Sequence, residues 1–116
     1  MDNKLKIILN CLLEKKGKDI VYCDISKRNP LANYLIIATA NGAHHAYSLA
    51  NNIKSECAKN SIDVVAVEGK NGSEWILVDA YDYLINIFTP EGRFKFALEK
   101  LYSDLKLIKV SDEWKY

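Results

Sequence analysis

The stretch EWILVDAYDYLINIF, residues 74–88, contains two apolar runs of β-branched and aromatic residues joined by a short link. The runs are Glu74 to Asp79 and Tyr83 to Phe88, and their composition is typical of strands. Because the link Ala80-Tyr81-Asp82 is so short, we expect the two strands to pair as an antiparallel hairpin. Neither side of the alternation in the first run is polar, which indicates that both faces of the hairpin are covered.

On the N-terminal side of the hairpin, the sequence predicts a strand, a helix and another strand. Tyr34 to Thr39 is apolar without alternation, as in a strand covered on both faces. The next segment has one apolar helical stripe, made of Ala46, Leu49, Ala50, Ile53 and Cys57. Ile62 to Val67 is a short apolar run of strand type. This part is long enough for a parallel crossover between its two strands.

Two further helices and one strand complete the expected elements. The first helix carries a stripe of Leu5, Ile8, Leu9, Leu12 and Leu13, with Asp2 or Asn3 as its cap. The strand Asp19 to Ile25 follows it. After the hairpin, Thr89-Pro90-Glu91 is a strong helix start. The third helix is expected to bury Phe94, Ala97, Leu98, Leu101, Tyr102 and Leu105.

The elements predict an α/β domain with a mixed five-stranded sheet and helices packed on it, in the order α-β-β-α-β-β-β-α. The domain is expected to span residues 1–105. Beyond Asp104 the apolar pattern fades, and residues 106–116 are interpreted as a C-terminal extension, either a strand followed by a tail or irregular chain.

Composition excludes several classes of protein. The 116 residues include 16 Lys and Arg against 15 Asp and Glu, and 49% are hydrophobic, which is typical of one globular domain. A chain so near neutrality is not expected to bind nucleic acid mainly by neutralising phosphates. If it acts on a large polyanion, we expect it to dock on a protein part of it.

The cysteines and the N-terminus indicate a cytoplasmic protein that does not enter a membrane. Cys11, Cys23 and Cys57 are widely spaced, lie in apolar segments and are interpreted as reduced buried thiols. The first residues lack the apolar core of a signal peptide, and no apolar run approaches about 20 residues.

No residue pattern predicts a catalytic, cofactor or metal site. A mixed sheet with helices resembles the nucleotidyltransferase architecture, but that chemistry needs paired carboxylates and the chain has no Asp-x-Asp. His44 and His45 are adjacent at a helix start, so their side chains diverge. They are interpreted as a polar helix opening. The alternative is that the free amides of Asn41, Gly42 and Ala43 bind an anion or a carboxylate of a partner.

The hairpin carries the most distinctive side chains. Trp75, Leu77 and Asp79 share one face, and Tyr81 and Tyr83 follow closely. These aromatic residues are either core or, if one face of the sheet is partly open, anchors of a protein interface. The lone amide of Asn86 is either satisfied within the sheet or faces a partner.

Several segments, in one order along the chain, resemble the Iojap-like family of bacterial ribosomal silencing factors. The segments are Leu31 to Asn41, His44-His45, Ala50-Asn51, Glu68-Gly69, Glu74 to Asp79, Tyr81 to Phe88, and the set Arg93, Phe96, Leu98, Glu99 and Leu101. The chain departs from the family at Asn33, Asn86 and Tyr102, where the family has Asp, His and Trp.

The resemblance implies a non-catalytic regulator with a nucleotidyltransferase-like fold. Members of the family bind ribosomal protein L fourteen, a basic protein of the large subunit, block the joining of the small subunit and so repress translation. Some form homodimers when free. The alternative that remains open is a nucleotide-binding or nucleotidyltransferase-type enzyme.

The resemblance and the residues together predict a partner-binding surface for ribosomal protein L fourteen. Trp75 and Tyr81 are expected to be anchors, Asp79 and Asp82 to pair with Lys or Arg of the partner, and Phe94 and Leu98 to complete the patch. The helical spacing of Phe94 and Leu98, however, favours their burial in the core over a place in the patch.

Overall fold

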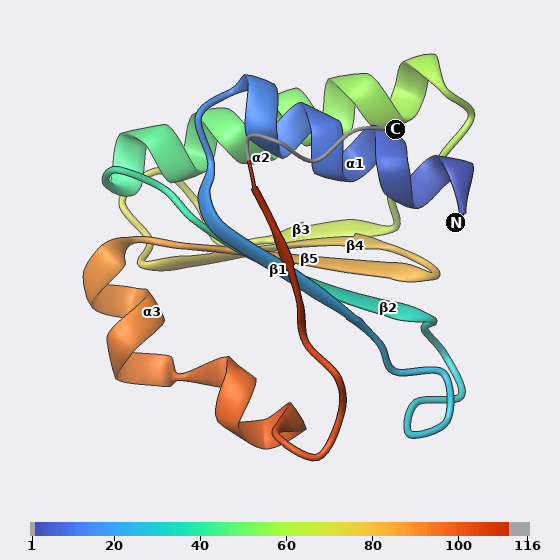
Figure 1. Ribbon diagram of the computed structural model, residues 1–116. Coiled ribbons are helices and arrows are strands. Elements are labelled where there is room, and N and C mark those ends of the chain that lie inside the picture. The colour runs from blue at the N-terminus through green and yellow to red at the C-terminus, as the bar shows by residue number, and fades with distance from the viewer. Residues whose placement is uncertain (1, 112–116) are drawn as a thin grey trace.

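The computed structural model describes residues 2–111 as a single sheet with helices on both sides (Figure 1). The helices are α1 (Asn3–Glu14), α2 (Ala43–Lys59), α3 (Pro90–Phe96) and the short 3₁₀-helix η1 (Leu98–Tyr102). The strands are β1 (Lys18–Asp24), β2 (Tyr34–Thr39), β3 (Ala66–Glu68), β4 (Trp75–Ala80), β5 (Tyr83–Phe88) and β6 (Ile108–Val110). Among the residues described, no helix has the length and apolar character needed to cross a membrane.

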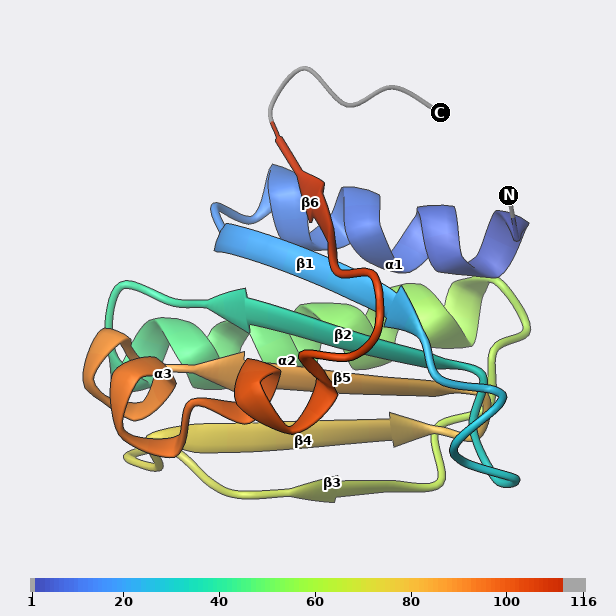
Figure 2. The same ribbon diagram turned by 60° about the horizontal axis from the view of Figure 1, so that its bottom comes forward.

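The sheet is mixed, as expected, but it has six strands and not five. Its order is β3-β4-β5-β2-β1-β6, with β2 and β5 parallel and the other neighbours antiparallel (Figure 2). The added strand β6 pairs with β1, placing Val110 opposite Ile20 and Ile108 opposite Tyr22. A three-residue strand has too few residues to show a period, and its hydrogen bonds come from a strand far away in the sequence.

The crossover through α2 joins strands that run in the same direction without being neighbours. β3 pairs antiparallel with β4, β4 pairs antiparallel with β5, and β5 is parallel to β2. β3 therefore runs parallel to β2 but lies at the far edge of the sheet. The hairpin of β4 and β5, predicted from residues 74–88, fills the space between them.

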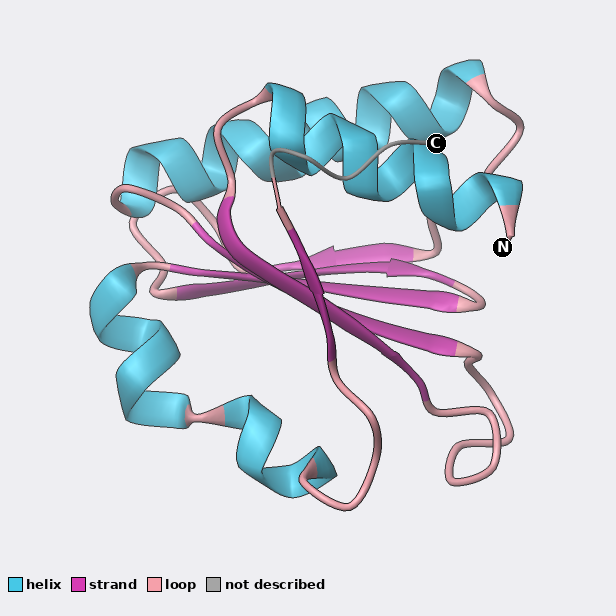
Figure 3. Cartoon of the chain, in the orientation of Figure 1, coloured by secondary structure: helices cyan, strands magenta, loops and turns pink. Residues whose placement is uncertain are grey.

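α1 and α2 cover one face of the sheet, called here the helical face (Figure 3). Both predicted helical stripes are confirmed except at Leu13, which is only partly buried. They pack on the strand residues that point the same way, including Ile76 and Val78 of β4. Cys11 and Cys57 belong to this core, and burial raises the pKa of each thiol to about 11.

α3 and η1 cover only part of the opposite face, called here the second face (Figure 1). Its smaller core is made of Val21, Cys23, Ile25, Ala32, Leu35, Ile37, Phe88 and Leu98. β4 shows the difference between the faces directly. Ile76, Val78 and Ala80 on the helical face are buried, whereas Trp75, Leu77 and Asp79 on the second face are half-buried. The expectation that both faces are covered is therefore only partly correct.

The expectation of one continuous third helix is wrong. α3 ends at Phe96, and Ala97 takes a left-handed conformation with φ of 45°, after which the chain continues as η1. Arg93 bonds Glu99 across this bend at 2.8 Å and also donates from Nη1 to Thr39 Oγ1 at 2.8 Å. These contacts hold α3 and η1 as an elbow against the end of β2. The local sequence pattern does not predict these contacts.

Asp2 joins the start of α1 to the end of the hairpin. Its Oδ1 accepts from the backbone N–H groups of Lys4 and Leu5, and its Oδ2 accepts from the Tyr83 hydroxyl at 2.6 Å. Partial burial alone would raise the pKa of Asp2, but these hydrogen bonds outweigh it and hold the pKa below its ordinary value. The same contacts raise the pKa of Tyr83, together with burial, which is the larger cause.

Asp2→Ala is expected to lower the free energy of unfolding at pH 7 by about 1 kcal/mol, the usual contribution of a helix cap. Because the folded pKa of Asp2 lies below the unfolded one, this contribution is present above about pH 4 and is lost as the pH falls through the folded pKa. Urea unfolding of both proteins between pH 2 and pH 7 measures it. The difference should shrink at the acid end, and a difference that grows there would contradict this role of Asp2. Asp63→Ala, at an exposed loop aspartate, is the control.

Candidate functional site

The part of the second face that the elbow leaves uncovered is the candidate site. It consists of Glu68 of β3, Trp75, Leu77 and Asp79 of β4, and Leu84 of β5, and we call it the open face. The strand register places these side chains together, because Glu68 is opposite Leu77 and Asp79 is opposite Leu84. Figure 2 shows this side of the molecule, where β3 and much of β4 lie beyond the elbow.

Trp75 lies at the border between the open face and the core. Its ring centroid is 5.0 Å from that of Phe88, which is fully buried, and 5.1 Å from that of Phe96. Phe96 is 44% exposed and comes from α3. The three rings form an aromatic cluster with one buried and one solvent-facing member. Phe96 was not among the predicted site residues, because it lies outside the expected helical stripe.

The side-chain amide of Asn86 has its hydrogen-bond partners within the sheet, so the first of its two interpretations is correct. Its side-chain Oδ1 accepts from Trp75 Nε1 at 3.0 Å. Its Nδ2 donates to the carbonyls of Ile36 and Leu84 at 3.3 and 3.2 Å. The amide therefore fixes the orientation of the indole ring of Trp75 from below the surface.

The other predicted residues of the hairpin are Asp79, Tyr81 and Asp82, which lie at the opposite end of β4. Asp79 is about 13 Å from Trp75 at the usual rise per residue of a strand. Tyr81 is 60% exposed and has φ of 58°, and its N–H donates to Asp79 Oδ1 at 3.2 Å. Asp82 is also exposed, and its carbonyl accepts from the N–H groups of Asn33 and Tyr34. The turn is therefore anchored to the loop before β2.

The two predicted residues of the third helix are separated by the elbow. Phe94 is 90% exposed on α3, whereas Leu98 is 9% exposed and packs in the second-face core. The predicted residues thus form two groups at the two ends of β4, with Leu98 beneath the surface. A single patch has to include Leu77 and Leu84, which lie between the groups and which the sequence interpretation left out.

Two carboxylates, those of Glu68 and Asp79, lie on the open face, and that of Asp82 lies in the turn at one end of it. Glu68, Asp79 and Asp82 take part in none of the ion pairs found among residues 2–111. At the Trp75 end, Lys95 pairs with Glu74 at 3.6 Å and also lies 5.4 Å from the ring centroid of Phe96. The face therefore combines exposed apolar area with an excess of negative charge.

A shallow depression of about 320 Å³ lies beside Trp75. It is lined by Glu68, Gly69, Trp75 and Leu77. Gly69 has φ of 108°, and a Cβ there would lie 2.9 Å from the Trp75 carbonyl oxygen. Only glycine fits this turn without strain, so the chain can pass close to β4 and leave the depression open.

His45 has a structural role at the helix start, whereas His44 is exposed. His45 Nδ1 accepts from the Asn41 N–H at 2.8 Å, and its Nε2 donates to the Lys15 carbonyl at 2.8 Å. The Asn41 amide is therefore occupied, which contradicts the alternative of an anion site made by all three free amides. Among residues 2–111, no group of three His, Cys, Asp or Glu side chains is arranged to hold a metal ion.

Comparison with known families gives one match that spans almost the whole chain. The family model described as "Ribosomal silencing factor during starvation" matches residues 1–115. The chain is 33% identical over 101 residues to Ribosomal silencing factor RsfS of Chromobacterium violaceum, covering 87% of this chain and 83% of that protein.

Two other proteins support the likeness at the level of structure and of more distant sequence. A crystal structure of a protein from Chromobacterium violaceum has a TM-score of 0.84 and 31% identity, covering 89% of this chain and 88% of that one. The mouse protein named "Mitochondrial assembly of ribosomal large subunit protein 1" is 22% identical over 102 residues, covering 85% of this chain and 45% of that protein.

Proposed function

This chain belongs to the family of ribosomal silencing factors, and from that premise we propose that it represses translation by binding ribosomal protein L fourteen with its open face. The bound protein would then stand between the large and the small subunit and block their joining. The mouse relative, whose name refers to the large subunit, supports the choice of subunit.

The observation that carries the proposal is the half-exposed aromatic cluster of Trp75, Phe88 and Phe96. Interface hot spots are enriched in Trp, and they lie where a rigid aromatic residue is surrounded by contacts that exclude water. Trp75 meets these conditions because Asn86 holds its ring and Phe96 borders it. Leu77 and Leu84 extend the apolar area along the sheet.

Charge supports a basic partner. Glu68, Asp79 and Asp82 stand around the apolar area and take part in none of the ion pairs of the described chain. Acids at the rim of an interface attract a basic surface and exclude acidic ones, with more effect on association rate than on affinity. A basic ribosomal protein fits this rim better than the phosphates of ribosomal RNA, which the acids would repel.

Size supports a steric mechanism. The fold extends 33 × 32 × 30 Å, so the bound molecule is much larger than the patch of side chains that holds it. A rigid body of this size seated on a surface that must contact the small subunit would prevent that contact without any chemical step. We place no catalytic residue in this mechanism, and a homodimer of the free chain stays an expectation.

A subunit-joining experiment tests the proposal. Purified small and large subunits are mixed at a Mg²⁺ concentration that favours joining, with and without a molar excess of this protein. On a sucrose gradient, the joined-ribosome peak should fall at least severalfold, and the protein should sediment with the free large subunit.

Two outcomes would contradict the proposal. The first is an unchanged peak of joined ribosomes, and the second is co-sedimentation with the small subunit alone. Heat-unfolded protein at the same concentration is the control for non-specific effects. A pull-down of this chain with isolated ribosomal protein L fourteen, weakening as salt rises, would identify the partner.

A further inference from the structure

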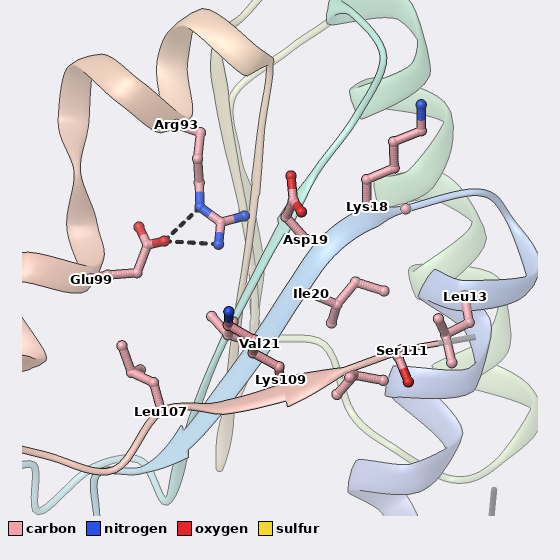
Figure 4. A pocket seen from close by; sticks show the side chains of 12 residues that line it. Leu13, Lys18, Asp19, Ile20, Val21, Arg93, Glu99, Leu107, Lys109 and Ser111 are labelled. Atoms are coloured by element: carbon pink, nitrogen blue, oxygen red, sulfur yellow. Dashed lines mark hydrogen bonds and ion pairs between the residues drawn. The ribbon is translucent and has the colours of Figure 1, made fainter. Parts of the chain in front are cut away.

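A second candidate site lies at the other end of the sheet, where β1 and β6 form its edge (Figure 4). A cavity of about 650 Å³ opens there between the end of α1 and the elbow of α3 and η1. Its lining includes Asp19, Val21, Arg93, Glu99, Leu107 and Lys109. Cavities of 300–1,000 Å³ are the usual size of small-molecule sites.

An irregularity in β1 shapes the cavity. The pairing of β1 with β2 shifts register between Lys18 and Val21, and Asp19 between them has φ of 49°. An irregularity of this type bends a strand and re-aims its side chains, and it often lies beside a functional site. Here it separates the start of β1 from the elbow.

The floor of the cavity is apolar. Val21 is buried and Leu107 is half-buried, both on the second-face core, while Val110 faces the helical core with Ile20. Since Val21 and Lys109 are opposite each other in the antiparallel pair, the Lys109 side chain projects on the same side of the sheet as Val21. Figure 4 shows Lys109 and the Arg93–Glu99 pair around the same space.

The charges around the cavity favour an anion. Arg93 is already engaged, because Nε and Nη2 bond Glu99 and Nη1 donates to Thr39. Lys18 and Lys109 take part in none of the ion pairs found in the described chain. Against these two ammonium groups stands one carboxylate outside the Arg93 pair, that of Asp19.

We propose that this cavity binds a small organic anion with a flat apolar body. The body would lie over Val21 and Leu107, and its carboxylate, sulfonate or phosphate group would accept hydrogen bonds from Lys109. The site shares no residue with the open face, so it does not depend on the proposed ribosomal function.

The probe for this site is 1-anilinonaphthalene-8-sulfonate, which combines a flat apolar body with one anionic group. For a ligand of this size in a partly exposed cavity, the dissociation constant is expected to be about 10–100 μM. Titration of the full chain by fluorescence measures it. Amide chemical shifts in NMR spectra then locate the probe, and changes are expected at residues 17–21 and 107–111.

Paired charge reversals test the role of the lysines. Lys109→Glu should weaken probe binding at least tenfold, because it replaces a charged donor with a repelling carboxylate. Lys106→Glu makes the same change in net charge on an exposed residue that does not line the cavity, and it should leave binding unchanged. Leu107→Trp should fill the cavity and also abolish binding, with near-ultraviolet circular dichroism confirming that each variant is folded.

Three results would overturn the proposal. One is absence of probe binding to the full chain at 1 mM probe. Another is equal loss of binding in Lys109→Glu and Lys106→Glu, which would indicate a general charge effect. The last is chemical-shift change confined to residues 75–79, which would place the probe on the open face.

Discussion

Replacing Trp75 by alanine is expected to weaken binding to the large ribosomal subunit at least tenfold. Loss of a buried aromatic anchor at an interface hot spot typically costs about 2 kcal/mol or more, which corresponds to more than tenfold in affinity. Trp75 is the aromatic residue of the open face whose ring is held on both sides, by Asn86 and by the Phe88 and Phe96 rings. Co-sedimentation with large subunits over a range of protein concentrations measures the affinity.

The same substitution also destabilises the fold, so the two effects need to be separated. Trp75→Ala removes two aromatic contacts and leaves Asn86 Oδ1, which is nearly buried, without its donor. The expected loss of stability is about 2–4 kcal/mol. Ile25→Ala is the matched control, because Ile25 is buried in the same second-face core but follows β1, which β2 separates from the hairpin, and the cost of such a change is similar.

The comparison of these two variants decides the role of Trp75. If Ile25→Ala keeps its affinity while Trp75→Ala loses it, Trp75 is a docking residue. If both lose affinity in proportion to their stability, Trp75 is a core residue. Wild-type affinity of a folded Trp75→Ala protein would remove Trp75 from the proposed interface.

Gly92→Ala is expected to lower the free energy of unfolding by about 2–3 kcal/mol. Gly92 is buried where α3 presses on the start of β4, and a Cβ there would lie 2.5 Å from the Glu74 carbonyl oxygen and 3.1 Å from the Glu74 Cβ. The same carbonyl accepts from the Thr89 N–H at 3.0 Å. An added methyl group therefore has to push α3 away from the sheet, with the cost of overpacking.

The displacement of α3 also affects the open face, because α3 carries Phe96. A shift of α3 moves Phe96 from Trp75, so Gly92→Ala should also weaken binding to the large subunit. Gly42→Ala is the control, because no atom lies within 4 Å of a Cβ at Gly42 and its φ of −175° is open to any residue. Thermal unfolding measures the stability of both variants. If Gly92→Ala is as stable as Gly42→Ala, α3 is not seated on Glu74 as described.

Much of the candidate site could be predicted from local pattern, and part of it could not. The period of two in residues 75–79 placed Trp75, Leu77 and Asp79 on one face, and the structure confirms this. Phe96 could not be predicted, because its position depends on where α3 stops. The third helical stripe failed for the same reason, leaving Phe94 exposed and Leu98 buried.

The sequence by itself determined the helices α1 and α2, the hairpin of β4 and β5, and the mixed character of the sheet, because these depend on periodicity and turn length within one segment. The match of several ordered segments also pointed to the family that the comparisons confirm. Contacts between distant segments decided the rest. Pairing with β1 made a strand of Ile108–Val110, and the bonds from Arg93 to Thr39 and Glu99 fixed the elbow.

The tertiary structure alone decided which face of the hairpin remains open. Each face of β4 carries apolar side chains in sequence, and Asp79 is the one charge among them, so the pattern does not fix which side receives less cover. Two long helices pack against the helical face, while the second face has only the short elbow. The area around Trp75 stays uncovered because of this unequal packing, and it is there that we propose the partner binds.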